Sequence, residues 1–115
     1  MITPLPRLQA WLLLLAIGAG GSAAVATAAA AKATTHTVIM EGSRFIPSAL
    51  VVKAGDVVVW VNKDLFPHTA TSKAGTFDSQ AIAVGKSWTY TAVTRGDYAY
   101  TCTFHPTMKG KLRVQ

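Results

Sequence analysis

Cysteine, acidic residues and helical periodicity are all scarce in this 115-residue sequence. Its single cysteine, Cys102, excludes an intramolecular disulfide framework. Only 5 residues are acidic against 11 that are basic, and the sequence offers no paired-carboxylate site for acid–base catalysis. No window keeps a helical hydrophobic period for more than one turn, which argues against an α-helical fold. The length allows one domain at most and excludes a two-domain enzyme.

Hydrophobic residues are concentrated at the N-terminus, where they fill 21 of the first 31 positions but only 37 of the remaining 84. Arg7 precedes an apolar run from Trp11 to Ile17, and small residues follow from Ala23 to Ala31. A positive charge, an apolar centre and small residues, in that order, are typical of a secretory signal peptide. We therefore predict a signal peptide over residues 1–31, cleaved between about residues 24 and 31, and one domain over residues 32–115.

An uncleaved membrane anchor is the alternative for the same segment. Leu8 to Ala31 is a stretch of 24 residues without charge, and about 20 apolar residues are enough to cross a bilayer. The strongly apolar part is short and the second half is rich in Gly and Ala, which favours cleavage. With either outcome the domain faces an oxidising space outside the cytoplasm. We expect a periplasmic protein, with no stable membrane association once the leader is removed.

Turn-forming residues recur throughout the predicted domain and separate short runs rich in β-branched and aromatic residues. Side chains alternate between faces along a strand, so Tyr98, Tyr100 and Cys102 are expected to share one face. The predicted strands are Thr35–Met40, Ala49–Lys53, Val57–Val61, Ser87–Thr91, Asp97–Thr101 and Lys111–Val114, with weaker ones at His68–Ser72 and Gln80–Ala83. This pattern predicts an all-β fold, a two-sheet β-sandwich.

The residues that carry chemistry gather between the last two predicted strands. A thiol, an imidazole and a thioether follow one another at intervals of three residues, at Cys102, His105 and Met108, and a second imidazole, His68, lies in an earlier loop. A Cys thiolate and two His, with a weakly bound Met, are the ligands of blue-copper electron-transfer sites. We therefore predict that these four residues bind one copper ion, which cycles between Cu(I) and Cu(II).

Each of these residues also has a structural explanation when it is taken alone. A cysteine at a strand end is commonly a small buried hydrophobe, and a methionine commonly fills the core. A loop histidine is commonly a surface imidazole. These explanations are independent of one another, whereas the copper site uses all four residues at once, and this favours copper. The remaining histidine, His36, matches no ligand spacing and is expected to be structural.

Several segments of the predicted domain resemble the small cupredoxins, the type 1 blue copper proteins, and the amicyanins most closely. The segments that carry the resemblance are Phe45–Pro47, Leu50–Asp56, Val59–Asn62, Pro67–His68, Gly96–Tyr100 and Cys102–Lys111. The ligand loop, with two residues between Cys102 and His105 and two between His105 and Met108, is similar in spacing to that of amicyanins. The sequence departs from the amicyanin pattern at Phe104, where proline is usual, and at Thr107, where an aromatic residue is usual.

The resemblance implies a Greek-key sandwich of eight strands or slightly fewer. It implies His68, Cys102 and His105 as in-plane copper ligands and Met108 as the axial one. It also implies transient redox partners, with an amine dehydrogenase as electron donor and a c-type cytochrome as acceptor. We expect the protein to be a monomer and to have no enzymatic activity of its own.

Electrons are expected to leave through the surface imidazole of His105. The residues expected to form an apolar collar around it are Phe66, Pro67, Phe104, Pro106 and Met108. The charge of the predicted domain is about +5, from 10 basic and 5 acidic residues. The cations expected to surround the collar and steer an acidic partner are Lys63, Lys73, Lys109, Lys111 and Arg113.

Supporting roles are predicted for several other residues. The backbone N–H of Thr69 is expected to face the Cys102 sulfur, since such contacts orient and tune a ligand. Asn62 and Asp64 are expected to form a turn. The residues expected to pack in the core are Trp60, Trp88 and Tyr98, the last with its hydroxyl hydrogen-bonded.

A copper carrier or tolerance protein, which delivers copper rather than electrons, is the main alternative function, because the same four ligands would serve it. An enzyme is a weaker alternative. The sequence has no nucleophile with an adjacent base, and three histidines cannot supply a second copper centre for a substrate. Nucleic-acid binding is not expected, because no basic stretch is interleaved with aromatic residues.

Overall fold

The computed structural model describes residues 18, 20–21 and 32–115. The predicted signal peptide, and with it the membrane-anchor alternative, therefore lies outside the described residues apart from three glycines. Within the described part of the chain all regular structure is β-strand. This part holds no helix long and apolar enough to cross a membrane.

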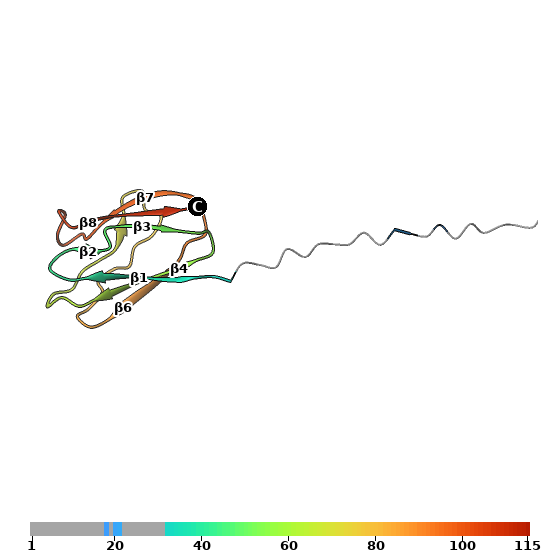
Figure 1. Ribbon diagram of the computed structural model, residues 1–115. Coiled ribbons are helices and arrows are strands. Elements are labelled where there is room, and N and C mark those ends of the chain that lie inside the picture. The colour runs from blue at the N-terminus through green and yellow to red at the C-terminus, as the bar shows by residue number, and fades with distance from the viewer. Residues whose placement is uncertain (1–17, 19, 22–31) are drawn as a thin grey trace, which may run out of the picture. The chain divides into compact units, whose positions relative to one another are not determined.

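Eight strands form two four-stranded sheets that face each other (Figure 1). The strands are β1 (Thr35–Met40), β2 (Phe45–Ile46), β3 (Ala49–Val52), β4 (Val57–Asn62), β5 (Thr71–Ser72), β6 (Ser87–Thr91), β7 (Gly96–Thr101) and β8 (Lys109–Val114). The first sheet has the order β2-β1-β4-β6 and the second β3-β8-β7-β5. Each sheet contains one parallel pair, β1 with β4 and β3 with β8, and the other pairs are antiparallel. The predicted all-β, two-sheet sandwich is confirmed.

The six stronger strand predictions are confirmed to within two residues at each end. The two weaker ones are largely wrong. His68–Ser72 is a strand only at its last two residues, and Gln80–Ala83 contributes only a bridge between Ile82 and His68. In this region side-chain oxygens accept some of the backbone N–H groups that a neighbouring strand would otherwise accept. The N–H of Ala70 donates to Ser79 Oγ, and that of Phe77 donates to Ser72 Oγ. Strand β2 has only two residues, too few to show a period in sequence.

Aromatic side chains fill the space between the sheets. The Trp60 ring is fully buried; its centroid lies 5.6 Å from that of Trp88 and 5.5 Å from that of Tyr100, to which it is nearly perpendicular. Trp60 belongs to the core, as predicted, and Trp88 is partly buried and packs against it. Burial of such large side chains is the main stabilising contribution in a domain of this size. The Tyr98 hydroxyl donates to the carbonyl of Thr94 at 2.6 Å, so its predicted hydrogen bond is also confirmed.

The alternation along β7 determines where the cysteine lies. Tyr98 is half-buried, Tyr100 is buried, and Cys102, directly after the strand, is fully buried on the same side. The predicted shared face of these three residues is confirmed. Because the face points into the sandwich, the thiol reaches the interior at the end of the molecule where the β7–β8 loop lies.

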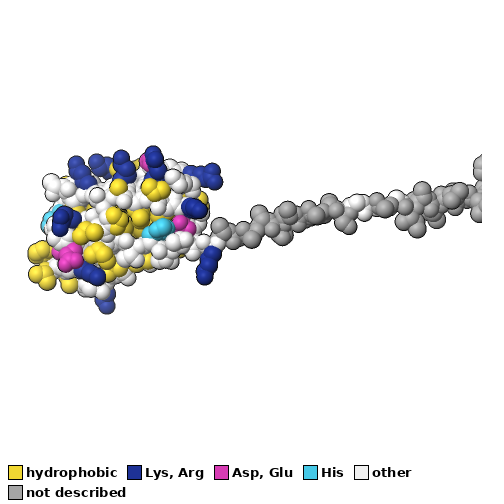
Figure 2. Space-filling view, in the orientation of Figure 1, with side chains coloured by type: hydrophobic (Ala, Val, Ile, Leu, Met, Phe, Trp, Pro, Cys, Tyr) yellow, Lys and Arg dark blue, Asp and Glu magenta, His cyan; other side chains and the backbone are white. Residues whose placement is uncertain are grey.

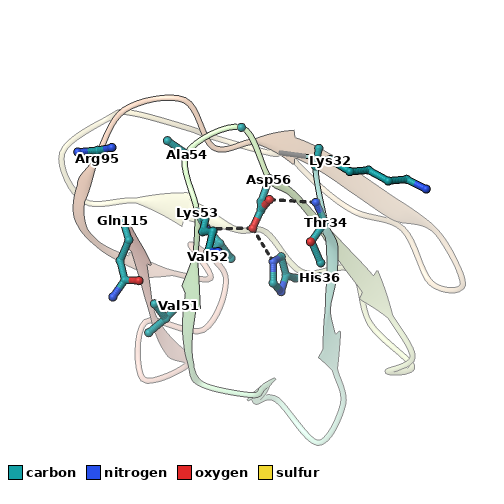
Figure 3. Close-up of a pocket in the computed structure, with 12 residues that line it drawn as sticks. Lys32, Thr34, His36, Val51, Val52, Lys53, Ala54, Asp56, Arg95 and Gln115 are labelled. Atoms are coloured by element: carbon teal, nitrogen blue, oxygen red, sulfur yellow. Dashed lines mark hydrogen bonds and ion pairs between the residues drawn. The ribbon is translucent and has the colours of Figure 1, made fainter. Parts of the chain in front are cut away.

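At the start of β1, His36 is joined to the turn before β4 through Asp56 (Figure 3). The carboxylate of Asp56 accepts the backbone N–H groups of Thr34 and Lys53, each at 2.9 Å, and a ring N–H of His36 at 3.0 Å. The hydrogen bonds from Thr34, His36 and Lys53 lower the pKa of Asp56 from 3.8 to about 2. His36 therefore has the structural role expected of it, holding β1 to the β3–β4 turn.

Candidate metal centre

Two overlapping turns fold the β7–β8 loop so that its functional residues converge. The N–H of His105 donates to the carbonyl of Cys102 at 3.2 Å, and the N–H of Met108 donates to the carbonyl of His105 at 2.8 Å. The N–H of Cys102 closes the loop on the carbonyl of Met108 at 3.1 Å. Each turn joins two residues three positions apart, and this accounts for the Cys-x-x-His-x-x-Met spacing. Cys102 and Met108 are buried at the base of the loop, whereas His105 is partly exposed.

His68, in the loop between β4 and β5, reaches the same cluster from an earlier part of the chain. Its backbone exchanges two hydrogen bonds with Ile82, at 3.2 and 2.7 Å, which fix the chain directly after Pro67. Its ring is completely buried, with Nδ1 3.7 Å from Cys102 Sγ. The other ring nitrogen, Nε2, lies 2.6 Å from Asp64 Oδ2. A carboxylate only accepts, so this contact assigns the ring proton to Nε2 and leaves the lone pair of Nδ1 facing the sulfur.

The remaining contacts complete a small cluster. The centroid of the His105 ring lies 5.3 Å from that of His68, with 62° between the ring planes. The N–H of Thr69 points at Cys102 Sγ at 3.3 Å, which confirms the predicted contact. The Thr69 hydroxyl in turn accepts the N–H of Thr103 at 2.9 Å, so the two loops are tied together beside the sulfur. His68, Cys102 and His105 are thus adjacent through their side chains, and Met108 joins them through its backbone.

The donor set fits a soft metal ion that also accepts nitrogen. The Cys102 sulfur is held in place by the N–H that it accepts, and an imidazole with its proton fixed on the far nitrogen is ready to coordinate. Thiolate, thioether and imidazole together match copper better than a hard cation, which prefers oxygen ligands. Among the described residues, no group of three or more His, Cys, Asp and Glu side chains is arranged to hold an ion. Met108 is not one of these residue types, and its role as a fourth donor stays a prediction.

Asp64 is the residue whose role the sequence did not predict. It was expected only to form a turn, but its carboxylate joins two loops. It accepts the N–H groups of Gly42 at 2.6 Å and Ser43 at 2.8 Å, in addition to the ring proton of His68. Desolvation raises the pKa of Asp64, but the hydrogen bonds from Ser43, His68 and Gly42 outweigh it and hold the pKa below its usual value. An acidic residue four positions before a ligand histidine was the only sequence signal for this contact.

Asn62 supports the same loop from the end of β4. Its side-chain amide donates to the carbonyls of Phe66 at 2.7 Å and Ile82 at 2.9 Å, and its carbonyl accepts the N–H of Asp64 at 2.9 Å. The side chain is completely buried, so all of these groups need partners. Asn62 therefore does more than form a turn: it fixes the loop that carries both Asp64 and His68.

Large apolar side chains are exposed on the loops around His105. Leu65 is 84% exposed, Phe66 55% and Phe104 51%. The centroid of the Phe66 ring lies 6.4 Å from that of His105, so this part of the predicted collar is in place. Met108 is buried rather than part of the exposed rim. Figure 2 shows hydrophobic side chains gathered at the end of the domain where the loops meet.

Several known proteins are similar to this chain in sequence. The family profile of the cupredoxin-like domain matches residues 9–114. The amicyanin of Paracoccus versutus is 31% identical over 81 residues, which cover 66% of this chain and 61% of that protein. The amicyanin of Paracoccus denitrificans is 35% identical over 57% of this chain and 54% of that protein. The chain thus spans less than two thirds of these amicyanins. The plastocyanin of Scenedesmus fuscus is 34% identical over 62% of this chain and 86% of that protein.

Solved structures agree with these relatives. A mutant of amicyanin in its Cu(I) form has a TM-score of 0.67 and 28% identity over 70% of this chain and 82% of that one. A purple cupredoxin from Nitrosopumilus maritimus has a TM-score of 0.65 and 26% identity over 70% of this chain and 99% of that one. The copper-containing nitrite reductase of Thermus scotoductus SA-01 has a TM-score of 0.68 and 30% identity, over 73% of this chain but only 23% of that one. The predicted resemblance is confirmed: this chain belongs to the family of cupredoxin-like domains, as a small cupredoxin similar to the amicyanins.

Proposed function

We propose that this protein carries single electrons in the periplasm by means of one copper ion held by His68, Cys102, His105 and Met108. The observation that carries the proposal is the pair formed by Cys102 Sγ and His68 Nδ1, 3.7 Å apart, with the far nitrogen of His68 bonded to Asp64. The copper forms of related amicyanins support the choice of metal. Copper bound by these residues would supply a Cu(I)/Cu(II) couple. The export signal over residues 1–31 is part of the proposal.

The protein's contribution is to keep the four donors in place. The Thr69 N–H stabilises negative charge on the Cys102 sulfur, and Asp64 holds the His68 ring in one orientation and one tautomer. Hydrogen bonds within the β7–β8 loop fix the backbone of His105 and Met108. Ligands that are held this firmly move little when the charge of the site changes, and a small rearrangement is what rapid electron transfer requires.

Partner proteins would approach at the exposed end of the site. His105 is partly exposed there and is flanked by Phe66 and Phe104, which a partner can cover without desolvating charge. Transient redox complexes use small interfaces of this kind. We propose an amine dehydrogenase as the electron donor and a c-type cytochrome as the acceptor, with this protein acting as a monomer.

Burial of the ligands favours electron transfer over copper delivery. His68 and Cys102 are 0% exposed and Met108 is 2% exposed. A protein that hands copper to a partner needs ligands that the partner can reach, and only His105 is open here. The proposal also excludes enzymatic activity of this protein by itself, because the four donors form one centre and His36, the third histidine, is bonded to Asp56.

The test is the addition of Cu(II) to the purified protein. We expect an intense blue colour from charge transfer between the Cys102 thiolate and copper. The variants Cys102→Ser and His68→Gln should lose it, whereas His36→Gln, which removes a histidine at a distance from the site, should keep it. A pale Cu(II) complex in the unmodified protein would overturn the proposal.

A kinetic comparison separates electron transfer from copper delivery. The rate of electron self-exchange between Cu(I) and Cu(II) protein is measured beside the rate at which a chelator removes Cu(I). We expect self-exchange to be faster by orders of magnitude, because buried ligands slow the loss of the ion. Rapid removal of Cu(I) together with slow self-exchange would favour the copper-carrier alternative.

A further inference from the structure

The outer face of the second sheet, β3-β8-β7-β5, carries a row of cations. Lys109, Lys111 and Arg113 alternate along β8 with Leu112 and Val114, which point into the core. All three basic residues are exposed. Figure 2 shows Lys and Arg side chains in a line along the edge of the domain where Figure 1 draws β3, β7 and β8. Because side chains alternate between the two faces of β8, its three positive charges lie on one surface.

A fourth cation, Lys73, lies on the same surface beyond β7. Its N–H donates to the carbonyl of Ala99, and Ala99 is paired with Lys111 on the other side. Neighbouring strands are about 4.8 Å apart, so Lys73 and Lys111 are anchored about 10 Å apart with Ala99 between them. Lys109 is anchored about 7 Å from Lys111 along β8. Three lysines thus stand at the corners of a triangle.

The surface between these lysines is hollow, because small residues form much of its floor. Ser48, Ala49, Ala99, Gly110 and the buried Tyr100 line a depression of about 370 Å³ together with the three lysines. No acidic residue lines it. A negatively charged group can therefore approach the backbone between the lysines without displacing a side chain.

The lysines also form no ion pair within the described residues. Asp97 is the acidic residue on the outer side of β7, and it is engaged by Arg113 at 2.8 and 3.3 Å. The hydrogen bond from Arg113, together with the charges of Arg113 and, more weakly, Lys111, holds the pKa of Asp97 below its usual value, so Asp97 stays ionised. Asp78 lies beyond β5, where it accepts the hydroxyl of Thr71. In residues 32–115 no ion pair involves Lys73, Lys109 or Lys111.

The outer face of the first sheet shows that this charge is not a general property of the surface. Its cross-strand rows are formed by uncharged residues only, for example Thr37, Val59 and Thr89. The outward-facing residues of β1, β4 and β6 are Thr35, Thr37, Ile39, Val57, Val59, Val61, Ser87, Thr89 and Thr91. Positive charge is therefore concentrated on one of the two sheet faces, which gives the domain a directed electrostatic field.

We propose that the outer face of the second sheet is a docking surface for an acidic patch of a partner protein, whose carboxylates lie between Lys73, Lys109 and Lys111. These cations were predicted to surround the apolar collar, but Lys73, Lys111 and Arg113 lie on the outer face of the second sheet. Lys109 follows the ligand Met108 directly, so a partner bound to this face lies beside the ligand loop. In taking the partner to be a redox protein, the inference rests on the proposed function.

The composition of the face favours a protein over a membrane or a nucleic acid. Surface helices and loops that enter a membrane place large apolar residues beside their cations, and single-stranded nucleic acids stack on exposed aromatic rings. Of the large apolar side chains exposed in the described residues, only Val51 lies on this face. Lysine ammonium groups above a floor of alanine and glycine match carboxylates on a folded surface.

The test uses a capped hexaglutamate peptide and the full protein, both free of copper and loaded with it. Amide chemical shifts are followed by NMR in the copper-free and Cu(I) forms. We expect the changes to centre on Ala49, Ala99 and Gly110. The variant Lys73→Gln/Lys109→Gln/Lys111→Gln should bind about tenfold more weakly, since each exposed pair contributes roughly twofold to threefold. The control Lys32→Gln/Lys63→Gln/Lys86→Gln removes the same charge from other surfaces and should weaken binding less than threefold.

Equal weakening in the two triple variants would overturn the proposal, because only net charge would then matter. Shift changes spread over all lysines would overturn it as well. Vesicles containing phosphatidylglycerol are tested in parallel, and vesicle binding that depends on the three lysines while peptide binding does not would assign the face to a membrane. Binding to the copper-free protein is independent of the blue colour, so failure of this inference is distinguishable from failure of the proposed function.

Discussion

Removal of the Asp64 carboxylate is expected to weaken the fold and the metal site together. The carboxylate is the single connection through which Gly42 and Ser43, in the β1–β2 loop, are hydrogen-bonded to the ring of His68. In Asp64→Ala all three donors lose their acceptor, and the His68 ring loses the contact that fixes its tautomer. In Asp64→Asn one acceptor oxygen remains, so the same effects should be smaller.

The size of the effect follows from the number and setting of these hydrogen bonds. A hydrogen bond to a charged group contributes about 1.5–3 kcal/mol. The side chain of Asp64 is 11% exposed, so water replaces only part of what is lost. Because the three bonds share one carboxylate and are not additive, we expect a loss of about 2–4 kcal/mol for Asp64→Ala and about half of that for Asp64→Asn. Loss of a contact that orients a metal ligand typically lowers metal affinity about 10-fold to 100-fold.

The free energy of unfolding is measured by urea denaturation of the copper-free protein, and copper affinity by competition with a chelator. Asp78→Asn is the matched control, because Asp78 is an exposed loop carboxylate that accepts from Thr71 and Gln80 and is not bonded to a ligand. It should change stability by less than about 0.5 kcal/mol and leave copper affinity unaltered. If Asp64→Ala behaves like Asp78→Asn in both assays, the role assigned to Asp64 is refuted.

Two further predictions concern packing and pH. An added Cβ at Gly110 would lie 2.2 Å from Cζ of Tyr100, a ring enclosed by the core, so Gly110→Ala should destabilise the fold by about 1–3 kcal/mol in urea, whereas Lys111→Ala should change it by less than about 0.5 kcal/mol. A stable Gly110→Ala variant would show that the Tyr100 ring can move aside. The lowered pKa of Asp56 means that its hydrogen bonds stabilise the fold above about pH 4 and that this stabilisation is lost between about pH 4 and about pH 2. Asp56→Asn should therefore melt at a lower temperature at pH 7 and lack this part of the acid dependence; parallel melting profiles between pH 4 and pH 2 would contradict the assignment.

Periodicity located most of the strands, because burial on one face of a sheet leaves a direct imprint on sequence. The strands Thr35–Met40 and Ser87–Thr91 were predicted to the residue, and the alternation of Tyr98, Tyr100 and Cys102 placed the thiol inside. The segment between β4 and β6 was poorly predicted, since its backbone groups pair partly with side chains such as Ser72 and Ser79 and pair with a neighbouring strand only over short stretches. Side-chain acceptors leave no periodic signal.

The scarcity of cysteine left one informative thiol, Cys102, which lies three residues from a histidine and six from a methionine. Local spacing was sufficient there, because the three predicted donors lie in one short loop whose turns each join residues three positions apart. The predicted donor types in this loop followed from these residues alone, whereas the family resemblance also depended on five further segments of the domain.

Only the tertiary structure decided which groups outside that loop act on the site and where the charge lies. The bond from Asp64 to His68 depends on how two loops meet, and the triangle of Lys73, Lys109 and Lys111 depends on the order of β5, β7 and β8 in the second sheet. These residues are brought together by strand pairing between distant segments. Spacing along the chain contains no information about such contacts. For this reason the lysines were predicted to lie around His105, whereas in the fold they lie across the second sheet.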